Sequence, residues 1–348
     1  METATSPGTH APFDVHSVLR EDGTVTREGS GLTIEEAVAV YRHMRRVRIV
    51  DEKMIALQSD GQVAFHSSSL GEEAATCGAP FALRANDWLF GSPRDFGGAL
   101  VRGVSIADYV AHMFGQGATK GHSAPDHLAS RAHRVGSVSG ASGAHIPHAV
   151  GLAWAAKSKK EDVAVLCAFG EGATSAGDFH AGSNFAGVFK APVVLFCRNN
   201  GVAVSLPAEK QTRTESFAEK GIAYGIPYVV CDGLDVFAVV SAVREAVARA
   251  SRGEGATLIE ARTKRLREGG DPLPRLRAYL EGNGAWSDGA EIDCIAETEE
   301  ELARAVEQAA NAPSLSKKTM FDDVYAVPTR HLAEQADAAV SAANEAIR

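Results

Sequence analysis

The sequence predicts an α/β fold in which a mostly parallel central sheet is flanked by helices. Three observations lead to this prediction. Apolar runs rich in β-branched residues recur along the middle of the chain, helical patterns lie between them, and polar turns follow the first two runs. Runs that are apolar throughout are typical of strands buried on both faces, and strands that alternate with helices form parallel βαβ units.

The first helix is expected to begin after Thr33. Thr33 and Glu36 have the spacing of a capping box, and apolar residues recur at helical spacing over residues 34–44. Residues 1–30 before it are expected to form a flexible arm. The stretch 115–145 is rich in Gly, Ser and His and too long for a simple connection, so it predicts a functional or disordered loop.

Four strands and four further helices are expected beyond that loop. The strand candidates are residues 163–169, 193–197, 227–231 and 257–261. The helix candidates are residues 178–190, the segment capped by Asp235, residues 298–312 and residues 330–348. This pattern divides the chain into an α/β domain at 31–290 and a helical C-terminal arm at 291–348.

The composition excludes several classes of protein. The 348 residues are 45% hydrophobic and 23% charged, and 35 Lys and Arg against 44 Asp and Glu give a net charge of −9. Because that charge repels phosphate backbones and anionic bilayers, we expect neither nucleic acid nor membrane as a partner. No segment has the roughly 18 apolar residues of a membrane-spanning helix. The five cysteines lack CxxC spacing, and the first 19 residues lack Lys and Arg, so a reducing cytoplasm is expected.

Two polar turns carry the most informative pattern. Gly170-Glu171-Gly172 follows the run at 163–169, and Asn199-Asn200 follows the run at 193–197. A crossover of about 30 residues is the size of a βαβ unit, so Glu171 and Asn200 are expected at the carboxyl ends of neighbouring strands, where α/β sheets bind ligands. Carboxylate and amide oxygens suit Mg²⁺ or Ca²⁺, and Mg²⁺ with few protein ligands usually binds through phosphates.

The flanking residues also favour a phosphate ligand. Glycines beside Glu171 let the backbone approach a phosphate closely, and Arg198 adds positive charge. The spacing of Gly170, Gly172 and Gly177 does not match the dinucleotide fingerprint G-x-G-x-x-G, and Asp178 stands where a Walker motif needs Lys.

These residues resemble a known family. GEG at 170–172 and NN at 199–200 resemble the thiamine diphosphate motif GDG…NN, with Glu171 in the Asp position. The segment 169–205 is similar to the alpha subunit of the decarboxylating component of 2-oxo acid dehydrogenase complexes, and resembles the branched-chain type most. Further similar segments are the one around Arg94, LGEEA (70–74), HIPHAVGLAWAAK (145–157), CDGLDVFAV (231–239) and PRLRAYL (274–280).

The resemblance implies a thiamine diphosphate-binding fold and an assembly of two alpha and two beta chains. In that family the cofactor and Mg²⁺ lie between an alpha and a beta chain, and the beta chain supplies the glutamate that activates the aminopyrimidine. The implied activity is the oxidative decarboxylation of a 2-oxo acid, here of the branched-chain class, with acyl transfer to a lipoyl-bearing acyltransferase.

Carried over residue by residue, the resemblance also implies a site. Glu171, Asn200 and the carbonyl of Val202 would bind Mg²⁺, and Arg94 and Arg198 would contact the diphosphate. The rest of the implied cofactor-binding set is Gly170, Gly172, Ala173 and Ser142.

Three histidines deserve separate interpretations. His127 matches a Pro-x-His segment near the active site of relatives and is the candidate catalytic residue; a loop histidine with a local hydrogen bond is the alternative. His145 and His148 flank Pro147 at a helix start and are expected to be structural.

The sequence departs from the family at the site itself. Pro93 replaces a tyrosine, Gly140-Ala141-Ser142 replaces a Ser-Pro-Leu turn, and the potassium-site residues of some relatives are mostly absent. The segment 263–275 is shorter than the family's loop, so that Gly269 falls at or near the catalytic His position. We therefore expect metal and diphosphate binding with impaired decarboxylation or acyl transfer. The alternatives are a non-catalytic or regulatory paralogue, and an acetoin-cleaving or transketolase-like thiamine enzyme.

Overall fold

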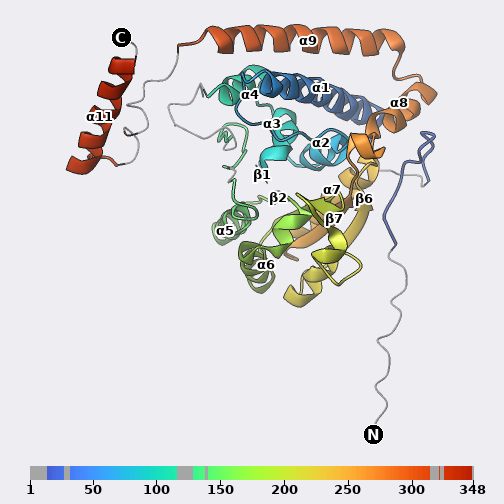
Figure 1. Cartoon of the computed structure of the whole chain (residues 1–348). Helices are drawn as coiled ribbons and strands as arrows, with labels where there is room; N and C mark the ends of the chain where they lie inside the picture. Colours follow the sequence, from blue (N-terminus) through green and yellow to red (C-terminus); the bar gives the residue numbers. More distant parts are fainter. Residues whose placement is uncertain are drawn as a thin grey trace.

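The computed structural model describes residues 14–26, 32–115, 128–137, 140–313, 321 and 325–346. A parallel sheet lies at the centre, with helices on both faces and a further layer of helices beyond one of them (Figure 1). The predicted α/β fold with a parallel central sheet is confirmed.

The sheet has five parallel strands in the order β1-β2-β3-β7-β6. The strands are β1 (Trp88–Phe90), β2 (Val165–Gly170), β3 (Val193–Asn199), β6 (Tyr228–Asp232) and β7 (Thr257–Arg262). Four of them lie where the apolar runs predict strands. The three-residue edge strand β1 was not predicted, because it is too short to give a pattern.

Successive side chains of the central strands pack against different helices. Leu166 of β2 and Val194 of β3 face the cluster built by α1 (Ile34–Ser59), α2 (Glu73–Phe81) and α7 (Val236–Ser251). Their neighbours Val165 and Val193 face the cluster that includes α5 (His145–Ser158) and α6 (Gly177–Phe189). Both faces are therefore covered, which explains why these strands are apolar throughout instead of alternating.

Four outer helices extend from the first of these clusters. They are α3 (Phe96–Val101), α4 (Ile106–Met113), α8 (Pro272–Gly282) and α9 (Asp288–Asn311), and α11 (Arg330–Ala346) follows α9 in the chain. Helix α9 lies along α1 and α4 (Figure 1). It begins ten residues before the expected 298, because Ser287 caps it by accepting from the N–H of Ala290. Thr33 and Glu36 form the predicted capping box of α1.

The N-terminal segment 14–26 differs from the flexible arm expected over 1–30. Its residue His16 donates its backbone N–H to Val230 O of β6 at 2.9 Å. Val18 and Leu19 are buried, and their N–H groups donate to Asp235 Oδ2 at 2.6 and 2.7 Å. Asp235 also caps α7, accepting from the N–H groups of Phe237 and Ala238. One carboxylate thus starts a helix and holds the N-terminal segment, which the sequence pattern does not reveal.

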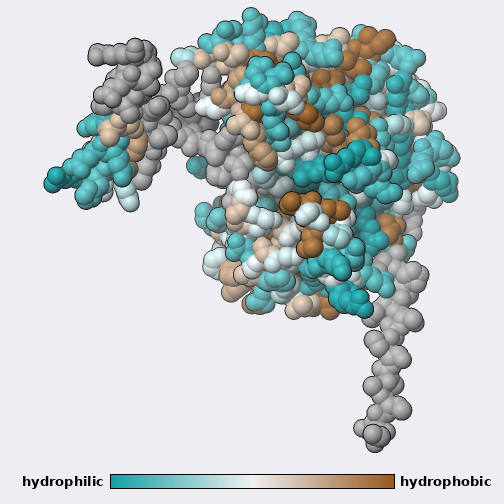
Figure 2. All heavy atoms as spheres, in the orientation of Figure 1, coloured by the Kyte–Doolittle hydropathy of each residue, from teal (hydrophilic) through white to brown (hydrophobic). Residues whose placement is uncertain are grey.

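One face of the molecule is largely hydrophilic (Figure 2), and the cysteines are unpaired. Hydrophilic residues dominate the face shown in Figure 2, with apolar residues interspersed among them. All five cysteines are free and buried. Among the described residues, every helix is too short or too polar to cross a bilayer.

Replacing Asp235 by Ala should destabilise the fold more than the loss of an ordinary helix cap. The variant removes an N-cap, which costs about 0.5–2 kcal/mol, and leaves buried N–H groups of the N-terminal segment without an acceptor at about 1–3 kcal/mol more. Urea unfolding followed by circular dichroism measures the change. Ser287→Ala, which removes the cap of α9, is the matched control, and an equal midpoint for both variants would contradict the expectation.

Candidate functional site

The candidate site lies at the carboxyl ends of β2 and β3. Gly170 pairs in register with Arg198, so the two turns that follow these strands lie side by side. The first turn is the 3₁₀ segment Glu171–Ser175, and the second leads into the small hairpin of β4 (Val202–Ala203) and β5 (Leu206–Pro207). The predicted neighbouring positions of Glu171 and Asn200 follow from this register.

Glu171 is a buried carboxylate with one unused oxygen. The residue is 3% exposed, and its Oε1 atom accepts no hydrogen bond within the described part of the chain. Burial raises the pKa of Glu171 above its ordinary value, although backbone N–H groups of Glu171 and Asn200 and the charge of Arg198 oppose that rise. An unpaired buried oxygen is costly, and a cation would satisfy it.

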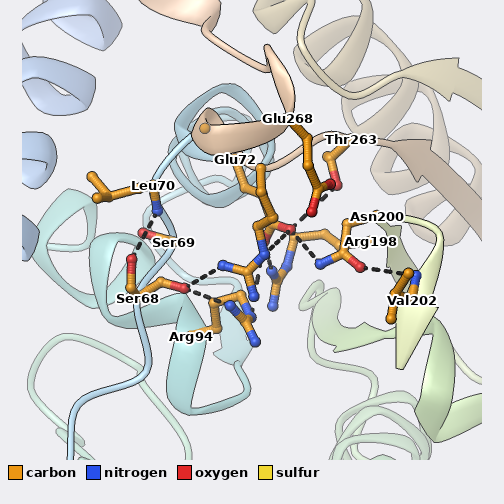
Figure 3. Close-up of polar contacts among 12 residues, drawn as sticks. Ser68, Ser69, Leu70, Glu72, Arg94, Arg198, Asn200, Val202, Thr263 and Glu268 are labelled. Atoms are coloured by element: carbon orange, nitrogen blue, oxygen red, sulfur yellow. Dashed lines mark hydrogen bonds and ion pairs between the residues drawn. The ribbon is translucent and has the colours of Figure 1, made fainter. Parts of the chain in front are cut away.

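Both polar atoms of the Asn200 side-chain amide form hydrogen bonds. Its Nδ2 group donates to Glu72 Oε1 at 2.8 Å, and its Oδ1 atom accepts from the backbone N–H of Val202 at 3.3 Å. The carbonyl oxygen is thereby turned away from Glu72 and toward the turn that carries Val202 (Figure 3).

Arg198 is almost completely enclosed by acceptors. Its side chain is 2% exposed. Nη1 donates to Glu72 Oε2 at 2.6 Å, and Nη2 donates to Ser92 Oγ and Asp95 Oδ2 at 2.9 and 3.0 Å. Nε lies 3.0 Å from Asp95 Oδ1. All three guanidinium nitrogens therefore contact groups of the chain itself.

Two other arginines reach the same place and are less enclosed. Arg94, from the 3₁₀ segment Pro93–Asp95, and Arg265 both donate to the carbonyl of Ser68. Their Nε atoms lie 3.9 and 3.6 Å from the two oxygens of Glu72, and Figure 3 shows Arg94 beside Glu72 and Ser68. With side chains 27% and 22% exposed, they can turn toward an anion that enters the site.

One cavity brings several predicted residues together. It has a volume of 200 Å³, and its lining includes Arg94, Ser142, Gly170, Ala173 and Arg198. These five come from four separate parts of the chain. A second, larger cavity of 660 Å³ adjoins Arg94 and Arg265 and is lined further by Phe65, Leu70 and Leu266.

His145 also lines the smaller cavity, at the start of α5. Its Nε2 atom lies 2.9 Å from Ala168 O, and its Nδ1 atom has no partner within the described residues. Burial lowers the pKa of His145, so the ring is neutral at neutral pH. Because a carbonyl only accepts, Nε2 carries the proton and Nδ1 keeps its lone pair.

The segment 263–271 is a short, closed turn. Its 3₁₀ portion is Leu266–Glu268, and Leu266 donates its N–H to Leu70 O at 3.1 Å. Gly71 has φ +90°, and a Cβ there would lie 2.3 Å from the backbone nitrogen of Leu266, so only glycine permits this contact. Gly269, at the expected catalytic His position, has φ +82° and ends the 3₁₀ portion.

Two further points concern predicted ligands. His127 lies outside the described residues, and its role stays a prediction. Among the described residues, no three His, Cys, Asp or Glu side chains are grouped so that they could hold a metal ion. The predicted set of Glu171, Asn200 and the Val202 carbonyl contains a single carboxylate and is not a group of that kind.

Sequence reasoning missed Glu72 and Arg265. Glu72 is fully buried, yet its segment LGEEA was noted only as part of the resemblance. Two consecutive carboxylates before the small, apolar helix α2 were a usable signal, because a buried acid needs partners. Arg265 lies in the segment whose shortness drew attention, but its contacts with Ser68 and Glu72 depend on the tertiary fold.

Comparison with known proteins decides the family. Residues 41–268 match the family model described as "Dehydrogenase E1 component". The chain belongs to this family. The predicted resemblance to the alpha subunit of the decarboxylating component of 2-oxo acid dehydrogenase complexes is thereby confirmed.

Three relatives of this E1 component are named as alpha subunits. The 2-oxoisovalerate dehydrogenase subunit alpha of Bacillus subtilis (strain 168) is 37% identical over 327 residues, covering 87% of this chain and 99% of the relative. The 2-oxoisovalerate dehydrogenase subunit alpha 2, mitochondrial, of Arabidopsis thaliana is 34% identical, covering 92% and 73%. The pyruvate dehydrogenase E1 component subunit alpha of Staphylococcus epidermidis is 31% identical, covering 94% and 93%.

Replacing Gly172 by Ala should loosen the hairpin of this E1 component beside the site. A Cβ at Gly172 would lie 2.7 Å from Ala203 Cβ, so β4 must shift, and such overpacking costs about 1–3 kcal/mol. We expect faster amide hydrogen exchange over residues 201–207. Gly177→Ala, whose Cβ would meet nothing within 4 Å, is the control, and equal exchange in both variants would contradict the expectation.

Proposed function

We propose that this chain is the alpha subunit of an enzyme that decarboxylates a branched-chain 2-oxo acid with thiamine diphosphate and Mg²⁺. The observation that carries the proposal is the unpaired, buried Oε1 of Glu171, on the strand end next to that of Asn200. A site of this kind needs a cation, and the adjoining arginines need an anion. A magnesium diphosphate supplies both.

The donor set fits Mg²⁺. Glu171 offers a carboxylate oxygen, Asn200 a carbonyl oxygen with a second lone pair, and Val202 a backbone carbonyl in a half-exposed residue (45% exposed). These are hard oxygen ligands, and Mg²⁺ completes its octahedron with phosphate and water oxygens. Glu171 and Asn200 directly follow β2 and β3, and Val202 begins β4 two residues after Asn200.

The anion-binding groups fit a diphosphate. Arg94 is partly exposed and lines the 200 Å³ cavity together with Ser142, Gly170 and Ala173. Arg198 lies behind them with both Nη atoms hydrogen-bonded within the chain and with Nε 3.0 Å from Asp95 Oδ1, so it contributes mainly its charge. Gly172, packed against Ala203, keeps the turn after β2 close to the hairpin. When bound, thiamine diphosphate supplies the electron sink that decarboxylation requires.

The larger cavity supports an aliphatic 2-oxo acid as substrate. Its 660 Å³ volume is lined by Phe65, Leu70 and Leu266 on the apolar side and by Arg94 and Arg265 on the charged side. A branched aliphatic chain fits the apolar side of this cavity, and a carboxylate fits the charged side. Two of the relatives are named for 2-oxoisovalerate, which has this composition.

Exposed apolar residues beside the site support a partner chain. Val204, at the tip of the β4–β5 hairpin, is fully exposed with φ +59°, and Leu206 is 47% exposed. Such patches are typical of interfaces. We propose a beta subunit there, in an assembly of two alpha and two beta chains, and acyl transfer to a lipoyl-bearing acyltransferase in the cytoplasm.

One observation favours a second candidate, a non-catalytic or regulatory paralogue that keeps the cofactor site. The turn 263–271 contains no histidine, and Gly269 stands at the expected catalytic position. This alternative shares the metal and diphosphate binding of the first and differs only in the chemical step.

Cofactor binding should depend on Glu171. In the complex of the full chain with its beta subunit, calorimetry should detect thiamine diphosphate binding in Mg²⁺ and none in EDTA. Glu171→Gln removes the charged ligand and should weaken binding by about tenfold or more, which is about 1.4 kcal/mol. Glu209→Gln, an exposed acid near the hairpin, should bind like the wild type. Mg²⁺-independent binding by the wild type would refute the proposed site.

Turnover of the 2-oxo acid should be slow at the step that requires a proton-transferring side chain. Because Gly269 offers none, we expect decarboxylation or lipoyl acylation to be slower by about 10²-fold or more, the usual contribution of general acid–base catalysis. The rates to measure are dye-coupled decarboxylation of 2-oxoisovalerate and acylation of a lipoyl domain, with the Bacillus subtilis enzyme in parallel. Equal rates for both enzymes would overturn this expectation, and no turnover at all would support the paralogue.

A further inference from the structure

We propose that Glu72 is a positioning residue that fixes the orientation of the Asn200 amide, so that the carbonyl oxygen and not the NH₂ group faces the metal. This inference rests on the proposed function. It assigns a role to a side chain that takes no part in the proposed ligand set.

Glu72 lies at the centre of the polar contacts of the site, and its side chain is buried. It is the N-cap residue of α2, its side chain is 0% exposed, and residues from distant parts of the sequence converge on it (Figure 3). Oε1 accepts from Asn200 Nδ2 at 2.8 Å and from Thr263 Oγ1 at 3.4 Å, while Oε2 accepts from Arg198 Nη1 at 2.6 Å. A ligand in the cavity would therefore meet the partners of Glu72.

The two neighbours of the Asn200 amide determine which way it faces. A carboxylate can only accept hydrogen bonds, so Glu72 selects the NH₂ group. The backbone N–H of Val202 can only donate, so it selects Oδ1. Since a carbonyl oxygen has two lone pairs, Oδ1 retains one for a cation. Partners that orient metal ligands in this way typically contribute a factor of about 10–100 to metal affinity.

Glu72 also balances the charge of the arginines. Arg198 is closely paired with it, whereas Arg94 and Arg265 lie 3.9 and 3.6 Å from its oxygens. The close pair stays within the chain, and the two looser arginines remain available to an incoming anion. Glu72 thus stabilises the three arginines, while Arg94 and Arg265 can still contact an anion.

The next residue provides a matched control. Glu73 is as buried as Glu72, with a side chain 0% exposed, and it too is paired with an arginine, Arg48. Its other oxygen accepts from the N–H of Gly71 at 3.0 Å. None of these partners is a proposed metal ligand. If both glutamates only stabilise buried ion pairs, their replacement should change metal affinity equally. If Glu72 positions Asn200, only the replacement of Glu72 should weaken metal binding.

Replacing Glu72 by Gln should reverse the orientation of the Asn200 amide or leave that orientation undetermined. The glutamine amide keeps the shape but presents an NH₂ group on one side. If that group faces Asn200, the Asn200 amide turns and its own NH₂ group faces the cation, which it repels. If it faces Arg198, the guanidinium loses its closest acceptor.

The experiment measures metal binding directly. The metal-free complex of the full chain with its beta subunit is titrated with Mn²⁺ in the presence and absence of excess thiamine diphosphate, and free Mn²⁺ is followed by electron paramagnetic resonance. E72Q should bind Mn²⁺ about 10–100-fold more weakly than the wild type. E73Q should bind like the wild type, with thermal unfolding recorded for both variants. Equal Mn²⁺ affinities of E72Q and the wild type, or equal losses in E72Q and E73Q, would overturn the proposal.

A second variant tests the orientation and guards against failure of E72Q to fold. In the double variant E72Q/N200D, the new carboxylate accepts from the glutamine NH₂ group and still offers an oxygen to the metal. Mn²⁺ affinity should therefore recover relative to E72Q, and a folded double variant that binds no better would overturn the proposal. If the wild type itself shows no Mn²⁺ binding that depends on thiamine diphosphate, the proposed function fails, which is a distinguishable result.

Discussion

The parallel pairing of β2 with β3 is the constraint on which the site depends. Because Gly170 lies opposite Arg198, the residues that follow each strand emerge at one edge, with Glu171 beside Asn200. Both strands are buried on both faces, so a shift of one residue would exchange the side chains that face α7 and α6. The core thereby specifies the register, and the register places the oxygens that a cation requires.

The three arginines of the site differ in how deeply they are buried. Arg198 is enclosed by Glu72 and Asp95, and this pairing offsets the desolvation of a guanidinium at the end of a buried strand. Arg94 and Arg265 share a backbone carbonyl and remain partly exposed. A net-acidic chain thus holds local positive charge where an anion can reach it, with the innermost arginine acting as part of the scaffold.

The sequence predicted those features that depend on local patterns. The apolar runs predicted four strands, and the spacing of GEG and NN predicted that Glu171 and Asn200 follow neighbouring strands, because both signals lie within one βαβ unit. Features that arise from tertiary contacts could not be read in this way. The edge strand β1 is three residues long, Asp235 holds a segment more than 200 residues away, and Glu72 gathers partners from three other parts of the chain.

The short turn 263–271 contacts Glu72 beside the arginines of the site and contains no histidine. Thr263 and Arg265 face Glu72, and Leu266 is locked against Leu70 by a contact that Gly71 alone permits. The residues that the turn retains therefore support the anion site, and the position at which the resemblance places an acid–base group is occupied by Gly269. The proposed metal ligands and Arg94 lie outside this turn, so their arrangement does not depend on a longer loop. Whatever proton transfer the reaction needs must then come from a residue outside this turn, on this chain or on a partner.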